Sequence, residues 1–221
     1  MTLKPRSTIC TSVGEKTTDA CITALKGQEF AEVRIDMLEK AGEADAKRIF
    51  ASHPKLIATC RPGRITDDER KGLLLAAIAA GAGFVDVEVD ASDGWKAEIV
   101  ATARAKKCQV IVSFHDYKKT PTRGELKQIV DWCFESGADI AKIACQVNSD
   151  GENARLLGLL DDKRKIIVIG MGAKGRITRI VAPILGSPFT FASAGVGKET
   201  AGGQIAKNAM LKIWEGMGTD D

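Results

Sequence analysis

Strand-like and helix-like segments alternate along nearly all of this chain of 221 residues. Eight short segments rich in β-branched and other apolar residues are predicted to be strands, and they cover 8–12, 32–35, 56–60, 84–89, 109–113, 139–144, 166–169 and 189–193. Each precedes a segment with helical spacing, and these segments cover 17–25, 44–50, 67–80, 95–106, 122–136, 153–160, 178–185 and 204–214. Strict alternation predicts parallel strands joined by right-handed crossovers.

Eight such units close most simply into a (β/α)8 barrel of the α/β class. No Pro- or Ser-rich linker divides the chain, so we predict a single barrel domain over residues 1–221. A doubly wound open sheet is the competing architecture. The barrel is favoured because charged residues fall repeatedly at the C-terminal ends of the predicted strands, where barrels place their catalytic groups.

Lys142 lies inside the sixth predicted strand, among apolar neighbours. Both faces of a strand in a parallel sheet are covered, so a lysine there has no easy route to water. Burial without a partner disfavours the charged amine, and we therefore expect an uncharged one. Such an amine can attack a ketone or aldehyde and form a Schiff base.

Other charged side chains lie at the same end of the predicted strands. These residues are Glu32, Arg34, Arg61, Asp86, Glu88 and Arg179. Asp86 and Glu88 share one face of the fourth strand by period-two alternation. An inner barrel strand has no solvent-exposed face, so both carboxylates must pair with buried cations, either Lys142 or the arginines.

The two histidines fall at opposite ends of the predicted strands. His53 precedes the third strand and belongs to the end of the barrel that carries no chemistry. His115 follows the fifth strand and so neighbours Lys142 on the sixth. An imidazole beside a Schiff-base lysine is well placed to move protons near neutral pH.

Composition argues against several kinds of partner and site. A net charge of +3, evenly spread, does not favour nucleic acid or a membrane surface as partner. No apolar run approaches the ~20 residues of a membrane-spanning helix, and the first residues lack a signal-peptide core. Six cysteines form no Cys-x-x-Cys pair, which predicts reduced core thiols in a cytoplasmic protein. Two histidines without clustered thiols give little support for a zinc site.

Two glycine-rich stretches are predicted to be flexible loops over a small-molecule site. Residues 170–175 match G-x-G-x-x-G, but no acidic residue follows about 20 positions later, as a dinucleotide site requires. Gly197 and Lys198 lack the upstream glycine of a P-loop. The segment from Thr200 to Gln204 is also expected to close over a ligand.

Taken together in chain order, these residues resemble type I 3-dehydroquinate dehydratase, and the resemblance covers nearly the whole chain. The matching motifs are Glu32-x-Arg34-x-Asp36, Thr59-x-Arg61, Val85-Asp86-Val87-Glu88, Ser113-x-His115-Asp116, Asp139-Ile140-x-Lys142-Ile143-Ala144, Gly175-x-Ile177-Thr178-Arg179 and Gly203-Gln204. The resemblance implies a barrel that dehydrates 3-dehydroquinate to 3-dehydroshikimate in the shikimate pathway without metal or cofactor. It also implies a homodimer.

The resemblance assigns roles to these positions. Lys142 would form the imine with the ring ketone, and His115 would act as general base and then general acid. The substrate-binding residues would be Glu32, Arg34, Arg61, Arg179, Thr200 and Gln204, with Arg179 holding the substrate carboxylate. We add the hypothesis that Asp86 or Glu88 orients the imidazole of His115.

The chain departs from the family pattern at two positions. Many family members carry Glu-Gly-Gly soon after the arginine of the third strand, and the resemblance gives that glutamate a part in catalysis. Here no acid follows Arg61 until Asp67, so this role is vacant or is taken by Asp67 or Asp68. Thr200 stands where serine is usual. Two alternatives remain open: a class I aldolase, which shares the Schiff-base lysine, and a ligand-binding barrel that has lost activity along with the loop glutamate.

Overall fold

The computed structural model describes residues 8–217. Its strands are β1 (Thr8–Val13), β2 (Ala31–Arg34), β3 (Leu56–Thr59), β4 (Phe84–Glu88), β5 (Gln109–Asp116), β6 (Ile140–Gln146), β7 (Ile166–Met171) and β8 (Phe189–Ser193). Its helices are α1 (Thr18–Leu25), α2 (Glu43–Ala51), α3 (Asp67–Ala79), α4 (Asp93–Ala105), α5 (Arg123–Glu135), α6 (Asp150–Leu157), α7 (Gly172–Val181) and α8 (Lys207–Gly216), with short 3-10 helices η1 (Ile35–Met37) and η2 (Gly158–Asp161).

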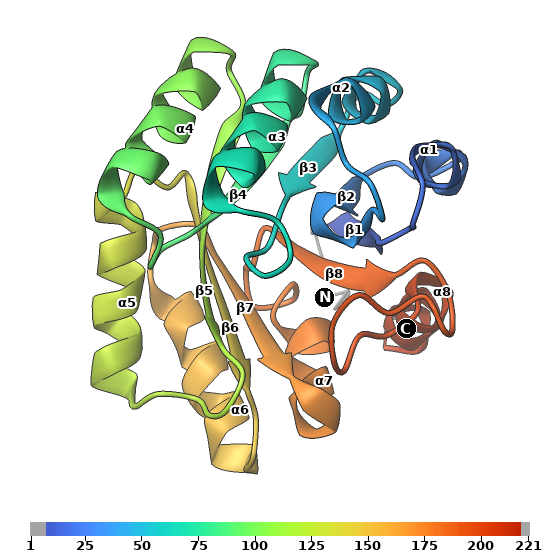
Figure 1. Ribbon diagram of the computed structural model, residues 1–221. Helices are drawn as coiled ribbons and strands as arrows, with labels where there is room; N and C mark the ends of the chain where they lie inside the picture. The colour runs from blue at the N-terminus through green and yellow to red at the C-terminus, as the bar shows by residue number, and fades with distance from the viewer. Residues whose placement is uncertain (1–7, 218–221) are drawn as a thin grey trace.

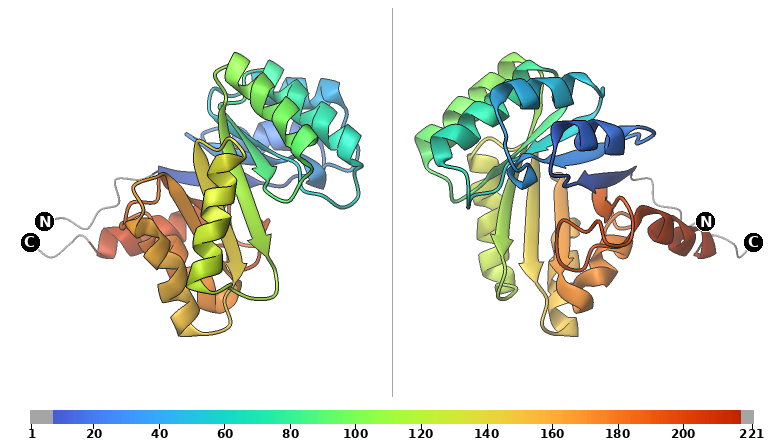
Figure 2. Two further views of the ribbon diagram at one scale, coloured as in Figure 1. Left: turned by 90° about the vertical axis from the view of Figure 1, so that its left-hand side faces the viewer. Right: turned by 45° about the vertical axis from the view of Figure 1, so that its right-hand side comes forward.

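The strands form a nearly closed (β/α)8 barrel, as predicted. All paired strands are parallel, in the order β7-β6-β5-β4-β3-β2-β1-β8. The register brings Thr8 of β1 opposite Phe189 of β8, and β7 contacts β8 without a hydrogen-bonded ladder. The helices surround the strands in Figures 1 and 2, so the sheet has a filled interior and a helix-covered outside. In the described part of the chain, no helix is long and apolar enough to span a membrane.

Aromatic rings fill the N-terminal end of the barrel. Phe30, Phe84 and Phe189 contact one another with ring centroids 5.0 to 5.9 Å apart. His53 lies at this same end, because its Nε2 atom is 2.7 Å from the carbonyl oxygen of Gln28, just before β2. The rings therefore close this end of the barrel interior with apolar side chains.

Capping residues fix where several helices begin at that C-terminal end. The hydroxyl of Thr66 accepts a hydrogen bond from the Glu69 N–H while the Glu69 carboxylate accepts from the Thr66 N–H. Thr122 and Glu125 form the same reciprocal pair at the start of α5. Each box satisfies backbone donors that the first turn leaves open. Both strand-to-helix loops are thereby held in place.

The glycine-rich stretch at 170–175 was wrongly predicted to be a loop. Gly170 lies inside β7, and Gly172 already begins α7, six residues before the predicted start at 178. A Cβ atom on Gly175 would lie 2.3 Å from the Gly170 carbonyl carbon. The glycines therefore allow the first turn of α7 to pack directly on β7, and this stretch is not a flexible loop.

This close approach predicts a large loss of stability in Gly175→Ala. Overpacking against backbone cannot be relieved by a side-chain rotation, so the free energy of unfolding should fall by about 3 kcal/mol. For a domain of this size that corresponds to a Tm lower by roughly 10 °C in thermal unfolding. Gly151→Ala is the matched control, since Gly151 lies in the first turn of α6 with no atom within 4 Å of the added methyl group. Equal Tm values for the two variants would contradict the packing argument.

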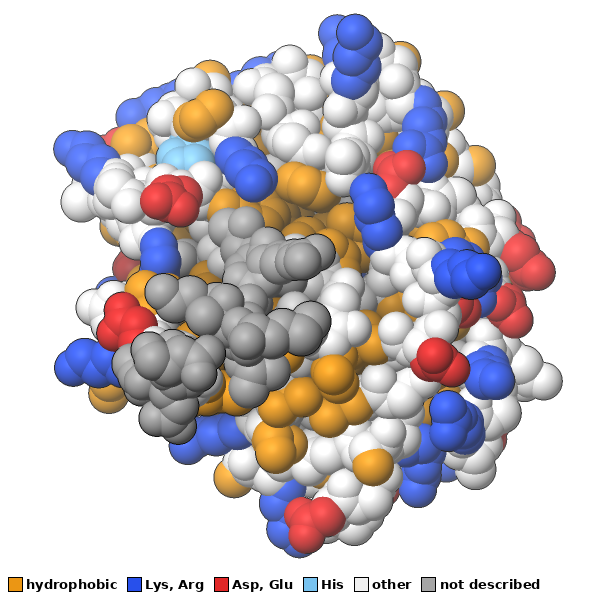
Figure 3. Space-filling model, turned by 180° about the vertical axis from the view of Figure 1, so that it is seen from behind, with side chains coloured by type: hydrophobic (Ala, Val, Ile, Leu, Met, Phe, Trp, Pro, Cys, Tyr) orange, Lys and Arg blue, Asp and Glu red, His pale blue; other side chains and the backbone are white. Residues whose placement is uncertain are grey.

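Charged residues of both signs decorate the outside of the barrel. On the face shown in Figure 3, lysine and arginine side chains are interspersed with aspartates and glutamates, and hydrophobic side chains are visible between them. No single-sign field dominates this face. The charges that matter for chemistry are inside the barrel mouth.

Candidate active site

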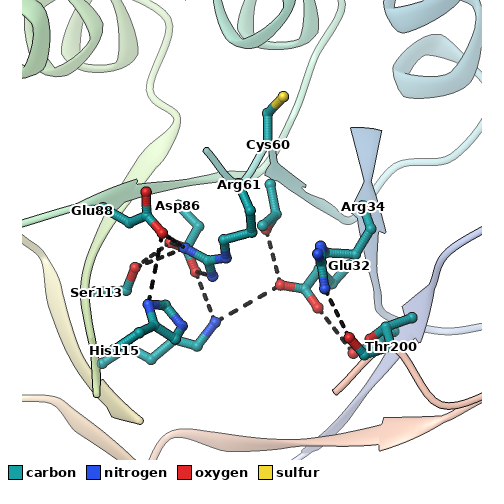
Figure 4. Close-up of polar contacts among 12 residues, drawn as sticks. Glu32, Arg34, Cys60, Arg61, Asp86, Glu88, Ser113, His115 and Thr200 are labelled. Carbon is teal, nitrogen blue, oxygen red and sulfur yellow. Dashed lines mark hydrogen bonds and ion pairs between the residues drawn. The ribbon is translucent and has the colours of Figure 1, made fainter. Parts of the chain in front are cut away.

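A cavity of about 320 Å³ opens at the C-terminal end of the barrel. It brings together all eight residues that the sequence assigned to catalysis or substrate binding. The lining residues are Glu32, Arg34, Arg61, His115, Tyr117, Lys142, Ala144, Gln146, Ile169, Met171, Arg179, Phe191, Thr200, Ala201, Gly202 and Gln204. Asp86 and Glu88 do not line the cavity, but Figure 4 shows them next to Arg61 and His115, which do.

Lys142 projects from β6 into this cavity and is only 5% exposed. Its Nζ atom lies 2.9 Å from Asp86 Oδ2 and 3.8 Å from Glu32 Oε1. It also sits 4.4 Å from the centre of the Phe191 ring. The sequence led us to expect an uncharged amine, but the 2.9 Å contact is an ion pair between an ammonium and a carboxylate. The amine is thus held in place at the barrel floor.

Asp86 is the buried centre of the charge network. Its two oxygens accept hydrogen bonds from Arg61, Nη1 and Nη2 each at 2.9 Å, and Oδ1 also accepts from the Ser113 hydroxyl at 2.6 Å. Burial opposes ionisation of Asp86, but the charges of Arg61 and Lys142 outweigh it and lower its pKa well below the usual range. The predicted pairing of Asp86 with buried cations is confirmed.

Glu88 pairs with two arginines, of which the sequence singled out only one. Its Oε1 atom lies 3.6 Å from Arg61 Nη1, and its Oε2 atom lies 3.2 Å from Arg70 Nη2. Burial is the main cause that raises the pKa of Glu88, with Arg61 acting against it. Arg70 comes from α3, whose contribution to the site the strand pattern gave no reason to expect.

His115 lies within β5, which extends to Asp116 and is longer than predicted. Its ring stacks on Tyr117, with centroids 5.9 Å apart and planes inclined by 12°. Its Nδ1 atom is buried without a hydrogen-bond partner in the described chain and lies 3.9 Å from Glu88 Oε1. Burial and the nearby positive charges of Arg61 and Lys142 lower the pKa of His115 well below 6.5. The imidazole is therefore neutral near pH 7 and able to accept a proton.

Glu32 is fixed on the opposite side of Lys142. Its carboxylate accepts hydrogen bonds from the Ser12 hydroxyl and the Thr59 hydroxyl, each at 2.9 Å. Neither Ser12 nor Thr59 was predicted as part of the site, although both are inward-facing strand residues beside it. Three barrel strands thus hold one carboxylate beside the amine.

The loop between β8 and α8 is tied over the cavity by hydrogen bonds. Gln204 donates to the Ser12 hydroxyl at 3.1 Å and accepts from the Thr200 N–H at 2.7 Å. Arg34 donates to the Thr200 carbonyl oxygen at 3.0 Å and forms a bidentate pair with Asp36. This geometry agrees with the prediction that the segment from Thr200 to Gln204 closes over the site.

Arg179 reaches the cavity from α7 and is 1% exposed. It donates only long hydrogen bonds, 3.4 Å to the Phe191 carbonyl oxygen and 3.3 Å to the Gly202 carbonyl oxygen. Its Nε atom is buried without a partner, and no carboxylate among residues 8–217 forms an ion pair with it. Burial lowers its pKa to about 10, with Glu32 partly opposing this effect. Within the described part of the chain, this cation therefore lacks an anionic partner.

The acids of the β3–α3 loop do not reach the cavity. The side chain of Asp67 is 76% exposed and pairs with Arg70, and neither Asp67 nor Asp68 lines the cavity. Arg64 of the same loop donates to the backbone carbonyl oxygens of Leu38 and Glu39. The loop is therefore docked on the segment after η1, and the carboxylates that pair with the amine in the described part of the chain are those of the barrel strands.

The chain is similar in sequence and in fold to known proteins. The model of the type I 3-dehydroquinase family matches residues 8–221. The 3-dehydroquinate dehydratase of Methanocaldococcus jannaschii is 36% identical over 219 residues, covering 95% of this chain and 98% of that protein. That of Dehalococcoides mccartyi is 33% identical over 201 residues, covering 87% of each.

Solved structures agree with the sequence comparison. A crystal structure of type I 3-dehydroquinate dehydratase from Clostridium difficile, with covalent modified comenic acid, has a TM-score of 0.84 and 26% identity. The match covers 97% of this chain and 93% of that one. The family model and the relatives above 30% identity extend over nearly the whole chain, and the chain therefore belongs to the type I 3-dehydroquinase family.

Proposed function

We propose that this protein is a 3-dehydroquinate dehydratase that works through a Schiff base on Lys142. The observation that carries the proposal is one cavity that holds a buried lysine, a neutral histidine and an arginine without an anion. These three groups suit a substrate with a ketone, a hydrogen on the carbon beside it, and a carboxylate. The relatives named above carry this activity in their names.

The reaction begins at the amine. Lys142 gives up one proton, its Nζ atom attacks the ketone carbon, and the ketone oxygen leaves as water to give a protonated imine. The imine withdraws electrons, so the hydrogen on the adjacent carbon becomes acidic. Asp86, whose pKa is lowered by its two cations, stays ionised and stabilises the positive charge that remains on the imine nitrogen.

His115 then moves the proton. Its neutral imidazole takes the hydrogen from the carbon beside the imine, which gives an enamine and an imidazolium. The imidazolium returns the proton to the hydroxyl on the next carbon, the C–O bond breaks, and water leaves. Hydrolysis of the conjugated imine releases the enone product and the free lysine.

Arg179 supplies the anion site. A guanidinium offers paired N–H donors whose geometry matches a carboxylate, and the buried, unpartnered Nε atom leaves this capacity unused. Thr200 and Gln204 lie on the same side of the cavity and would contact the same end of the substrate. Glu32, Arg34 and Arg61 would fix the ring hydroxyls or orient one another.

Loss of Arg179 should weaken substrate binding more than turnover. Arg179→Gln removes charged hydrogen bonds to the carboxylate, and KM is expected to rise roughly 10- to 100-fold. Arg176→Gln is the matched control, because Arg176 is exposed on the same helix. Steady-state kinetics of both variants make the comparison. An unchanged KM in Arg179→Gln would remove the carboxylate from this part of the cavity.

Two experiments test the proposed function: an assay of 3-dehydroquinate dehydration, and reduction of the imine on Lys142 with borohydride. The purified protein is mixed with 3-dehydroquinate while the ultraviolet absorbance of the conjugated enone is followed. A parallel sample is reduced with borohydride and digested, and the mass of the peptide carrying Lys142 is measured. Dehydration with an adduct on Lys142 is the expected result.

Two other outcomes correspond to the alternative functions. Cleavage of a sugar phosphate, with no turnover of 3-dehydroquinate, would indicate a class I aldolase. Absence of both turnover and adduct would indicate a ligand-binding barrel without activity. The unpaired Arg179 in the cavity suits the carboxylate of 3-dehydroquinate.

We further infer the cellular setting from the family. Residues 1–221 would act as one catalytic domain, as a homodimer, in the shikimate pathway that leads to aromatic amino acids, without metal or cofactor. Six free cysteines support a reducing compartment such as the cytoplasm. Light scattering of the purified protein tests the dimer.

A further inference from the structure

Arg70 is a buried charge that lies outside the cavity. It extends from α3 beneath the barrel rim and is 4% exposed. Its Nε atom donates to the Cys60 carbonyl oxygen at 3.0 Å, and Nη1 pairs with Asp67 at 2.7 Å. The guanidinium also lies 5.1 Å from the centre of the Trp95 ring. Three anchors therefore fix the position of its remaining nitrogen, Nη2.

That remaining nitrogen holds Glu88. Arg70 Nη2 lies 3.2 Å from Glu88 Oε2, which turns the other carboxylate oxygen toward the cavity wall. This second oxygen, Oε1, lies 3.9 Å from His115 Nδ1. Figure 4 shows the Glu88 carboxylate next to the imidazole ring, with a dashed line that marks this contact. Nδ1 is buried and has no hydrogen-bond partner among the described residues.

We propose that Arg70 is a positioning residue, which acts through Glu88 to fix the His115 imidazole for proton transfer. The inference rests on the proposed dehydration. Glu88 Oε1 accepts a hydrogen bond from His115 Nδ1–H when substrate closes the site, and Nε2 keeps its lone pair for the substrate. The 3.9 Å separation fits this step, because catalytic hydrogen bonds are often long before substrate binds.

The charges around this pair predict a pH signature. Glu88 is faced by the cations Arg61 and Arg70 and by the carboxylates Asp86 and Asp90, with His115 at the cavity side. Burial already raises the pKa of Glu88, and the two arginines act against that effect. Removal of Arg70 takes away one of them. The carboxylate should then take up a proton at higher pH and stop accepting the Nδ1–H bond.

The first test is the kinetics of Arg70→Gln over a range of pH. The turnover number is expected to fall about 10-fold or more at pH 7, which is part of the roughly 10²- to 10⁴-fold rate enhancement that a general base contributes. KM should change by less than about threefold. The acid limb of kcat/KM should move up by about one pH unit. Lys71→Gln is the control, since Lys71 is the next residue of α3 and its ion pair within residues 8–217 is with the surface residue Glu98. It should match the wild type.

A double-mutant comparison separates positioning from a purely structural role. If Arg70 acts through Glu88, then Arg70→Gln combined with Glu88→Gln should be no slower than Glu88→Gln alone. A structural role elsewhere would make the two losses multiply. Arg70→Lys keeps the charge at this position and should recover part of kcat and most of the pH profile.

These experiments distinguish a failure of the proposed function from a failure of the role proposed for Arg70. Failure of the wild type to dehydrate 3-dehydroquinate, or to form a Lys142 adduct, removes the function and the inference with it. A wild type that reacts, with Arg70→Gln showing the same kcat and pH profile, overturns the inference alone. Should Arg70→Gln not fold, as judged by circular dichroism, the combination of Arg70→Lys with Glu88→Gln decides. A combined loss of kcat no larger than that of Glu88→Gln alone supports the inference, and losses that multiply overturn it.

Discussion

Lys142→Met is expected to lower the dehydration rate by roughly four orders of magnitude or more, to the level of the background reaction. Methionine has a similar length but no amine, so no imine can form and the adjacent C–H stays weakly acidic. The ultraviolet assay of the enone measures the loss. Borohydride reduction in the presence of 3-dehydroquinate should leave the protein mass unchanged.

The fold of this variant should survive. Removing one member of a buried ion pair usually costs 3–5 kcal/mol, at order of magnitude, because a charge is left alone. Asp86 is not left alone here, since Arg61 still donates two hydrogen bonds to it. Thermal unfolding should therefore show a smaller loss than that range.

Lys96→Met is the matched control for this substitution. Lys96 is 3% exposed, and its Nζ atom pairs with Asp93 and donates to the Val89 carbonyl oxygen outside the cavity. The same change of residue type in an equally buried position should lower stability and leave kcat of the folded protein close to wild type. Substantial activity in Lys142→Met would exclude the imine mechanism.

The residue pattern predicted the barrel and the charged residues at its mouth for one physical reason, whereas the substrate-binding roles came from the resemblance to the family. A charged side chain is costly on a parallel strand that is covered on both faces. The charges at positions such as Lys142 and Arg61 therefore indicated the open end of the barrel. Period-two alternation then placed Asp86 and Glu88 on one face. Strand order followed from the unbroken alternation with helices.

The partner of each charge was not predictable in this way. Asp86 and Glu88 are two residues apart on the same face, yet Asp86 pairs with Lys142 whereas Glu88 pairs with Arg70. Arg70 comes from a helix, and the helix-to-sheet packing that carries it inward has no counterpart in a strand pattern. The start of α7 was not predicted for a related reason. A glycine-rich pattern is typical of loops, and it does not reveal that Gly175 packs against the backbone of Gly170.

His115→Ala should separate imine formation from proton transfer. The expected fall in kcat is about 10²- to 10⁴-fold, the contribution of a general base. Lys142 and its partner Asp86 are untouched, so the imine still forms, and borohydride should trap a Lys142 adduct while the enone absorbance stays low. His53→Ala is the control, because that ring lies at the other end of the barrel against the Gln28 carbonyl oxygen.

The pH dependence of kcat/KM in the wild-type protein tests the same role of His115. The imidazole must be neutral to accept the proton, and burial with nearby cations lowers its pKa well below 6.5. A lowered pKa means that the base stays neutral as the pH falls through 6.5, so kcat/KM should decline only at lower pH. A decline in kcat/KM centred above pH 6.5 would contradict the lowered pKa of this base. A folded His115→Ala variant that neither dehydrates the substrate nor forms the adduct would show that His115 is also needed for imine formation.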